Sequence, residues 1–476
     1  MTQFSVGSNL FDRNCFALAC VAVLAGCALG PDYQRPPVET PAAFRESGPW
    51  QQARPADDLP RGAWWKVFGD PQLDALEARL EDGSFSLAFA RSQYLQARAL
   101  ANGVQAARWP TATAGVGSSR SQASTATART GSPGIIKDDL AVVSVGWEAD
   151  LWGRIGRQVE AGEATADAGA ADLATVRLSL QAELARSYFL LRVTDAQRHL
   201  LADAVAAYEK SLELTRHRHL GGVATRLDVG QAETLLKTTR AQAIDLDVQR
   251  NQLEHAIAVL LGQAPAAFCL PEDSLVARLP TLPPGLPSSL LERRPDVAAA
   301  ERRAAAANAQ IGAAKAAFFP SFTISAAAGS ESSNLANWFS APARLWSVGP
   351  ALAGVIFDGG LRSARLEQAR AASDGAAAGY RQVVLQAFQE VEDALSTLRV
   401  LEQEALVQAE AVDAAKQTEE LTRNLYRLGT VTYLNVVTAQ ATALSVERTA
   451  NDLLARRYAA SVALIRALGG GWSHNL

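Results

Sequence analysis

Hydrophobic positions along the chain define two very long helical stretches. Residues 153–220 and 361–428 contain no proline and little glycine, and Ala and Leu recur throughout both. At a rise of about 1.5 Å per residue, each uninterrupted helix would be on the order of 100 Å long. Each stretch ends at glycine, and a second Ala- and Leu-rich helix follows at 227–261 and at 434–468. The pattern therefore predicts two long helical hairpins.

The two hairpins have the same internal spacing. Leu214-Thr215-Arg216 recurs as Leu421-Thr422-Arg423, 207 residues later, and the same offset carries Gly262 to Gly469. This register holds without slippage from about residue 176 to 262 of the first copy. A constant offset over such a length indicates that one long structural unit was duplicated.

Four shorter segments, 111–121, 140–149, 322–328 and 345–357, have the two-residue period of strands. Pro110 and Pro320 end the helical patterns that precede the first and third of them. About ten residues suffice to cross a bilayer as a tilted strand. Four strands cannot close into a membrane barrel, and open edges are not tolerated in lipid. Several chains would therefore share one barrel, and two or three chains are both compatible with the strands. A coiled-coil rod without a pore is the alternative for helices of this length.

The N-terminus carries an export signal. Residues 15–24 form an apolar core too short to span a membrane. Leu24-Ala25-Gly26-Cys27 resembles a bacterial lipoprotein box, which implies a lipid on Cys27, and the following Ala28 favours transfer to the outer membrane. An ordinary signal peptide with an incidental cysteine is the alternative. After processing, Cys269 would be the only other cysteine, so we expect no intrachain disulfide.

These patterns divide the chain into six segments. We predict a signal peptide at 1–26, a proline-rich, lipid-anchored tether at 27–63, a first repeat at 64–262, a linker at 263–285, a second repeat at 286–469 and a tail at 470–476.

Charge and motif content exclude several functions. The net charge is −4, and no basic stripe for nucleic acid is present. There is no HExxH, no glycine-rich phosphate loop, no G-x-S-x-G and no cysteine pair for zinc. Of the five histidines, only His217 and His219 are near each other, on an Arg-rich helix end typical of a protein surface. We therefore predict neither an enzyme nor a metal site.

Several motifs in family order resemble the TolC-like outer-membrane efflux lipoproteins. They are the segments at 64–71 (WWKVFGDP), 147–154 (WEADLWGR), 291–297 (LERRPDV), 357–360 (FDGG) and 387–395 (AFQEVEDAL). The resemblance implies a mostly helical homotrimer with a shared twelve-stranded transmembrane β-barrel and a periplasmic helical tunnel. It also implies a periplasmic adaptor, an inner-membrane RND-type pump, and no cofactor beyond the N-terminal lipid.

The implied function is a passive exit duct in the outer membrane of a Gram-negative bacterium. Small molecules such as drugs, toxic compounds or metal ions would leave through it. A duct for type I-like protein secretion is the alternative.

The resemblance further implies a constriction at the hairpin tips, near Gly221, Gly222 and Gly429. In similar ducts, Tyr and Arg side chains hold the tip closed and Asp rings set ion selectivity. Tyr426 keeps the family's aromatic residue, whereas Asn435 and Thr438 stand where relatives often carry Asp.

The first copy retains a carboxylate at this place. Asp228 occupies the position that corresponds to Asn435, and three chains would arrange three such carboxylates in a cation-favouring ring. Arg226 is a possible ion-pair partner for it, and Asp228 could equally be the N-cap of the returning helix. Arg216, Arg423 and Arg427 are candidate latch donors or, with similar weight, solvated helix charges.

Overall fold

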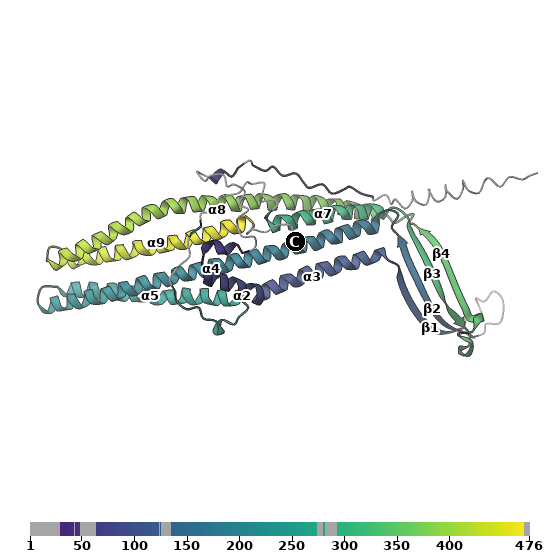
Figure 1. The fold of residues 1–476 in the computed structure, drawn as a ribbon, viewed down its shortest axis with the longest axis horizontal. Helices are drawn as coiled ribbons and strands as arrows, with labels where there is room; N and C mark the ends of the chain where they lie inside the picture. Colours follow the sequence, from purple (N-terminus) through teal and green to yellow (C-terminus); the bar gives the residue numbers. More distant parts are fainter. Residues whose placement is uncertain are drawn as a thin grey trace, which may run out of the picture. The chain divides into compact units, whose positions relative to one another are not determined.

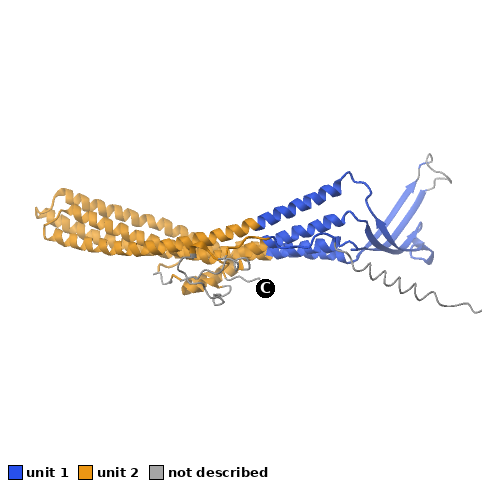
Figure 2. Ribbon diagram, turned by 90° about the horizontal axis from the view of Figure 1, so that it is seen from above, with its two compact units in different colours: residues 1–36, 94–169, 300–380 blue, residues 37–93, 170–299, 381–476 orange. Residues whose placement is uncertain are grey.

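The computed structural model describes residues 29–41, 43–47, 63–122, 124, 135–273, 279–280 and 293–470. The predicted signal peptide, Cys27 and most of the predicted tail lie outside these residues. The chain divides into two compact units, coloured separately in Figure 2. Unit 1 comprises 1–36, 94–169 and 300–380, and unit 2 comprises 37–93, 170–299 and 381–476.

Unit 1 contains one antiparallel sheet in the order β1-β2-β3-β4 (Figure 1). The strands are β1 (Thr111–Gln122), β2 (Ile135–Ala149), β3 (Ser321–Ser332) and β4 (Arg344–Ala353). The sheet contains the four predicted strands, with three corrections to their bounds. β3 extends four residues beyond its predicted end, because Gly329–Ser332 pairs with β2. β2 begins five residues earlier than predicted, because Ile135–Asp139 pairs with the end of β1. β4 ends four residues early, where Gly354 packs against the ring of Pro320.

The two faces of this sheet differ sharply in composition. Cross-strand partners share a face, and the register places bulky exposed side chains on one face, which we call the apolar face: Val116, Val143, Val145, Trp147, Ile324, Trp346, Val348 and Leu352. The opposite face carries mostly small and polar residues, including Thr111, Thr113, Ser144, Gly146, Ser325, Ser347 and Gly349. One face suits lipid and the other suits water, as in strands that line an aqueous channel.

The described helices are α2 (Pro71–Gly83), α3 (Phe85–Gln105), α4 (Arg154–Leu220), α5 (Arg226–Leu260), α7 (Pro295–Ala316), α8 (Leu361–Arg427) and α9 (Tyr433–Ala467). α4 and α8 each have 67 residues, and α5 and α9 each have 35. Both pairs begin 207 residues apart, which confirms the duplication. None of the described helices has an apolar stretch long enough to cross a membrane.

Unit 2 holds α5, α9 and the parts of α4 and α8 that pair with them (170–220 and 381–427), so that the two hairpins lie side by side (Figures 1 and 2). At the start of its packed part, Asp70 caps α2 by accepting from the main-chain N–H groups of Gln72 and Leu73, as the Asp-Pro sequence predicts. Three aromatic rings pack beside it. The ring centroids of Phe68 and Phe189 are 4.7 Å apart, and those of Phe189 and Tyr458 are 4.6 Å apart.

The described part of the predicted tether is extended apart from one turn at Arg45–Ser47, but its contacts are specific. In unit 1, Arg157 Nη2 lies 3.0 Å from Asp32 Oδ1. Gly30 crosses Gly312 of α7 so closely that a Cβ on Gly312 would stand 2.6 Å from the Leu29 carbonyl oxygen. The segment is therefore seated on α4 and α7 of its own unit.

Candidate gate at the hairpin turns

Both hairpins turn through the same backbone motif. Gly222 has φ +73°, and Val223 N–H donates to the Arg218 carbonyl over 2.8 Å. Gly429 has φ +80°, and the next residue likewise donates to the carbonyl five positions back. These are Schellman motifs, which need a residue in the left-handed region at this position. Gly221 has no positive φ, so only two of the three predicted tip glycines make the turn.

Asp228 holds the start of α5 in a capping box. Its Oδ2 accepts from Thr225 N–H over 2.7 Å and from Thr225 Oγ1 over 2.9 Å, while Asp228 N–H donates to Thr225 Oγ1. The N-cap is therefore Thr225, and Asp228 is the third helical residue rather than the cap. Within the described chain, Arg226 forms no ion pair with Asp228 and is exposed.

The corresponding turn of the second copy is held differently. Thr432 Oγ1 donates to Asn435 Oδ1 over 3.0 Å, and Thr438 Oγ1 donates to the Leu434 carbonyl over 2.9 Å. Both predicted polar positions therefore bond within their own helix end. The tip of one chain presents a carboxylate on the first hairpin and an amide on the second.

One arginine joins the two hairpins at the tip. Arg218 of α4 donates from Nη1 to the Tyr426 carbonyl of α8 over 3.1 Å, and its guanidinium carbon lies 4.6 Å from the centroid of the Tyr426 ring. Tyr426 is 8% exposed and meets Tyr433 edge-on, with ring centroids 5.2 Å apart. A cation over an aromatic face and a charge-assisted hydrogen bond reinforce one another here.

The predicted latch donors have other partners. Arg216 lies 3.8 Å from Glu233, Arg423 lies 3.9 Å from Glu419, and Arg427 donates to Asn424 over 3.4 Å. Each contact stays within one hairpin. Arg218 is a site residue that no sequence pattern singled out: it stands between His217 and His219, on a helix end that reads as surface charge.

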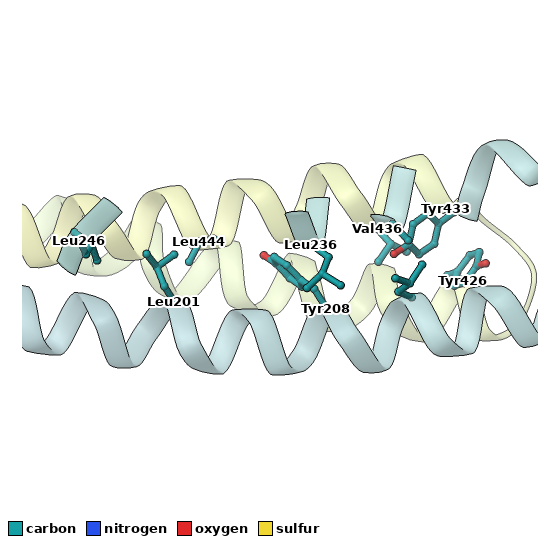
Figure 3. Packing of buried hydrophobic residues seen from close by; sticks show 10 residues of the cluster. Leu201, Tyr208, Leu236, Leu246, Tyr426, Tyr433, Val436 and Leu444 are labelled. Carbon is teal, nitrogen blue, oxygen red and sulfur yellow. The ribbon is translucent and has the colours of Figure 1, made fainter. Parts of the chain in front are cut away.

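Below the turns, both hairpins share an aromatic and aliphatic core (Figure 3). Tyr208 donates to the Gln440 carbonyl over 3.2 Å, and the hydroxyls of Ser211 and Tyr433 lie 3.1 Å apart. Burial raises the pKa of Tyr208 and of Tyr433 above the ordinary value for tyrosine. The contact between Arg218 and Tyr426 therefore lies next to a hydrophobic core to which both repeats contribute.

Farther from the turns, each of the two repeats has an ion pair between its two hairpin helices at the same position, with the acidic and basic residues exchanged. Glu209 of α4 pairs with Arg240 of α5, and Lys416 Nζ of α8 lies 2.8 Å from Glu447 Oε1 of α9. At the 207-residue offset, Glu209 corresponds to Lys416 and Arg240 corresponds to Glu447. In the described ranges, no three His, Cys, Asp or Glu side chains are placed to hold a metal ion.

The duplicated long helical hairpins, together with a sheet that is apolar on one face and polar on the other, define the class of membrane channels. The outer membrane efflux protein family model matches residues 77–263 and 286–470. The chain belongs to this family.

Relatives with known roles match over nearly the whole chain. The toluene efflux pump outer membrane protein TtgF of Pseudomonas putida is 32% identical over 464 residues, which cover 96% of this chain and 97% of the relative. The cation efflux system protein CusC of Escherichia coli is 31% identical over 460 residues, covering 95% and 98%.

Solved structures agree with the fold. The outer-membrane channel OprN has a TM-score of 0.87 at 33% identity and covers 94% of this chain and 100% of its own. The open-state Neisseria gonorrhoeae MtrE channel has a TM-score of 0.83 at 27% identity, covering 94% and 98%.

These matches confirm the predicted family and TolC-like fold class. They also confirm that the protein is an outer-membrane efflux channel of a Gram-negative bacterium and not an enzyme.

Proposed function

We propose that three copies of this chain close their sheets into one cylinder, with the polar face inside, to form a passive exit duct for small molecules. The sheet supports this proposal most directly, because no strand among the described residues pairs with the outer edge of β1 or of β4. Lipid cannot satisfy unpaired backbone groups, so copies must pair edge to edge. Chemical crosslinking of the detergent-purified protein should give a trimer, and a monomer or dimer would refute this arrangement.

The duct would receive its cargo from a periplasmic adaptor and an inner-membrane RND-type pump and would need no cofactor. The name of TtgF refers to toluene efflux and that of CusC to cation efflux, which supports small solutes as the substrate class. Deleting the gene and screening solvents, antibiotics and metal ions tests this. Unchanged sensitivity together with loss of a secreted protein would favour a protein-secretion duct instead.

Lipid attachment at Cys27 completes the proposed assembly. The described tether begins at Leu29, two residues after Cys27 in the sequence. Cys27→Ser should abolish palmitate labelling, and label that persists on the variant would contradict acylation there.

The gate is the second element of the proposal. Three Asp228 carboxylates around the tunnel axis would favour cations. Asp228→Ala should raise conductance and lower cation selectivity in a planar bilayer, although it also removes the capping box. Asp228→Asn keeps an oxygen acceptor for the cap and removes only the charge. Loss of selectivity in both variants supports the ring, whereas loss only in the Ala variant identifies the cap as the cause. Asn435→Asp should increase cation selectivity.

A further inference from the structure

Two basic side chains lie opposite each other at one margin of the apolar face, and a third lies on the same face at the level of Ala141, four residues along β2 from Lys137. The register puts Arg120 of β1 directly opposite Lys137 of β2, on the face that also carries Val116 and Val143. Arg344 begins β4 on the same face, next to Trp346 two residues along. Arg120 lies near the end of β1 and Lys137 near the start of β2, beside the β1–β2 connection. Arg344 is the first residue of β4, after the β3–β4 connection.

These cations are only partly neutralised. Lys137 Nζ lies 3.1 Å from Asp139 Oδ2, and Ser118 donates to the other oxygen of that carboxylate over 2.6 Å. Within the described residues, no acidic side chain lies within ion-pair distance of Arg120, and the sequence of the connection 123–134 contains no Asp or Glu. Like charges directly opposite one another on a sheet are unfavourable. An external anion between them would remove that repulsion.

The strand geometry fixes the height of this margin. Twelve residues separate Lys137 from Ala149 at the helix end of β2, a span of about 40 Å. A tilt of about 40° reduces this to about 30 Å along the membrane normal, which is the thickness of the hydrocarbon core. Arg120 and Lys137 therefore reach the headgroup level of the outer leaflet, and Arg344, lower on the face, reaches toward it with its long side chain.

We propose that Arg120, Lys137 and Arg344 form a binding site for the phosphate groups of lipids in the outer leaflet. Guanidinium groups bind phosphate oxygens in pairs through parallel hydrogen bonds, and an ammonium group adds a compact charge. Each chain of the channel carries one such site on its lipid-facing surface. Cations that were only hydrated at the membrane interface would not distinguish one lipid from another. This site would prefer lipids that carry phosphate.

The experiment uses the full-length protein purified in detergent and lipid A as the probe, with its phosphates intact or removed. Native mass spectrometry measures how much lipid stays bound. We expect the wild type to retain the phosphorylated lipid at least about tenfold better than the dephosphorylated form. Arg120→Gln/Lys137→Gln should lose this preference, whereas Arg120→Lys, which keeps the charge, should retain most of it. Arg365→Gln/Arg370→Gln removes two exposed charges from α8 and should behave as wild type.

Three results would overturn the proposal. The first is equal retention of the two forms of lipid A by the wild type. The second is equal loss of phosphorylated lipid in the strand variant and in the α8 control. The third is displacement of bound lipid by millimolar inorganic phosphate, which would define a site for a free anion. The Arg120→Lys variant also separates a lost site from a misfolded sheet.

Discussion

Glu77 on α2 is a carboxyl group that the fold keeps protonated. The residue is 1% exposed, and among the described residues neither of its carboxyl oxygens has a hydrogen-bond partner. Burial, with smaller contributions from the nearby acids Asp74 and Glu81, raises its pKa from 4.5 to about 9. The folded chain therefore holds a proton here at pH 7 that the unfolded chain releases, so this residue lowers the stability of the fold at neutral pH.

The magnitude follows from that shift. Below pH 4.5 both states carry the proton, and Glu77 costs nothing. Between pH 4.5 and about 9, the free energy of unfolding falls by about 1.4 kcal/mol per pH unit, because the folded state binds more protons. The accumulated cost is about 3 kcal/mol at pH 7 and under about 1 kcal/mol at pH 5. Glu77→Gln has nearly the same shape without the proton, so it should remove this cost.

Urea unfolding followed by far-UV circular dichroism at pH 5, 7 and 8 tests the reasoning. The Gln variant should exceed the wild type by about 3 kcal/mol at pH 7 and by more at pH 8, with the difference nearly gone at pH 5. Asp82→Asn, an exposed acid on the same helix, should give no such trend. A stability difference that does not change between pH 5 and pH 8 would show that Glu77 is already ionised in the fold.

Three further substitutions have expected outcomes. Gly312→Ala places a Cβ 2.6 Å from the Leu29 carbonyl oxygen, so the segment 29–36 should leave its seat and be cut faster in limited proteolysis read by mass spectrometry. Gly429→Ala forces alanine to φ +80° and should lower stability by about 1 kcal/mol, measured by thermal unfolding. Arg218→Ala removes both contacts to Tyr426 and should raise vancomycin entry into cells.

Matched variants control each of these. Gly103→Ala has no atom within 4 Å of the new Cβ and should leave proteolysis unchanged; similar cleavage in both variants would argue against the seat. Gly230→Ala lies inside α5 without positive φ, so it should stabilise by up to about 1 kcal/mol; destabilisation as large as that of Gly429→Ala would contradict the turn argument. Arg216→Ala should leave vancomycin entry unchanged, and equal effects of both arginines would remove the special role of Arg218.

The long helices were predictable because their signal is local. The proline-free runs and the terminal glycines gave the bounds of α4 and α8 to within a residue. The start of β2 was not predictable in this way. Lys137 and Asp138 read as the end of a polar loop at 122–138, and only their pairing with β1 makes them part of the strand.

The gate contacts depend on packing between hairpins that are far apart in the sequence. Five arginines stand near the two tips, and nothing in their spacing indicates which of them crosses from one hairpin to the other. Arg218 does so because the shared core, in which Tyr208 of α4 bonds to the Gln440 carbonyl of α9, fixes how α4 lies against the second hairpin. At the 207-residue offset, the counterpart of Tyr426 is His219, which bonds instead to the Ala224 carbonyl over 2.9 Å. The duplicated tips therefore have different roles, and the repeat alone cannot assign them.

The reversed ion pairs show how a duplicated chain can keep its two hairpins distinct. If α9 took the place of α5 beside α4, Glu447 would face Glu209; the reciprocal exchange would bring Arg240 against Lys416. Each correct pair is partly exposed and contributes under about 1 kcal/mol. A wrong pairing loses that attraction and adds a repulsion of similar size at both sites, so the difference between right and wrong pairing exceeds the value of either contact. A search for identical residues between the repeats misses this feature, because the charge reversal that provides the discrimination also removes the identity.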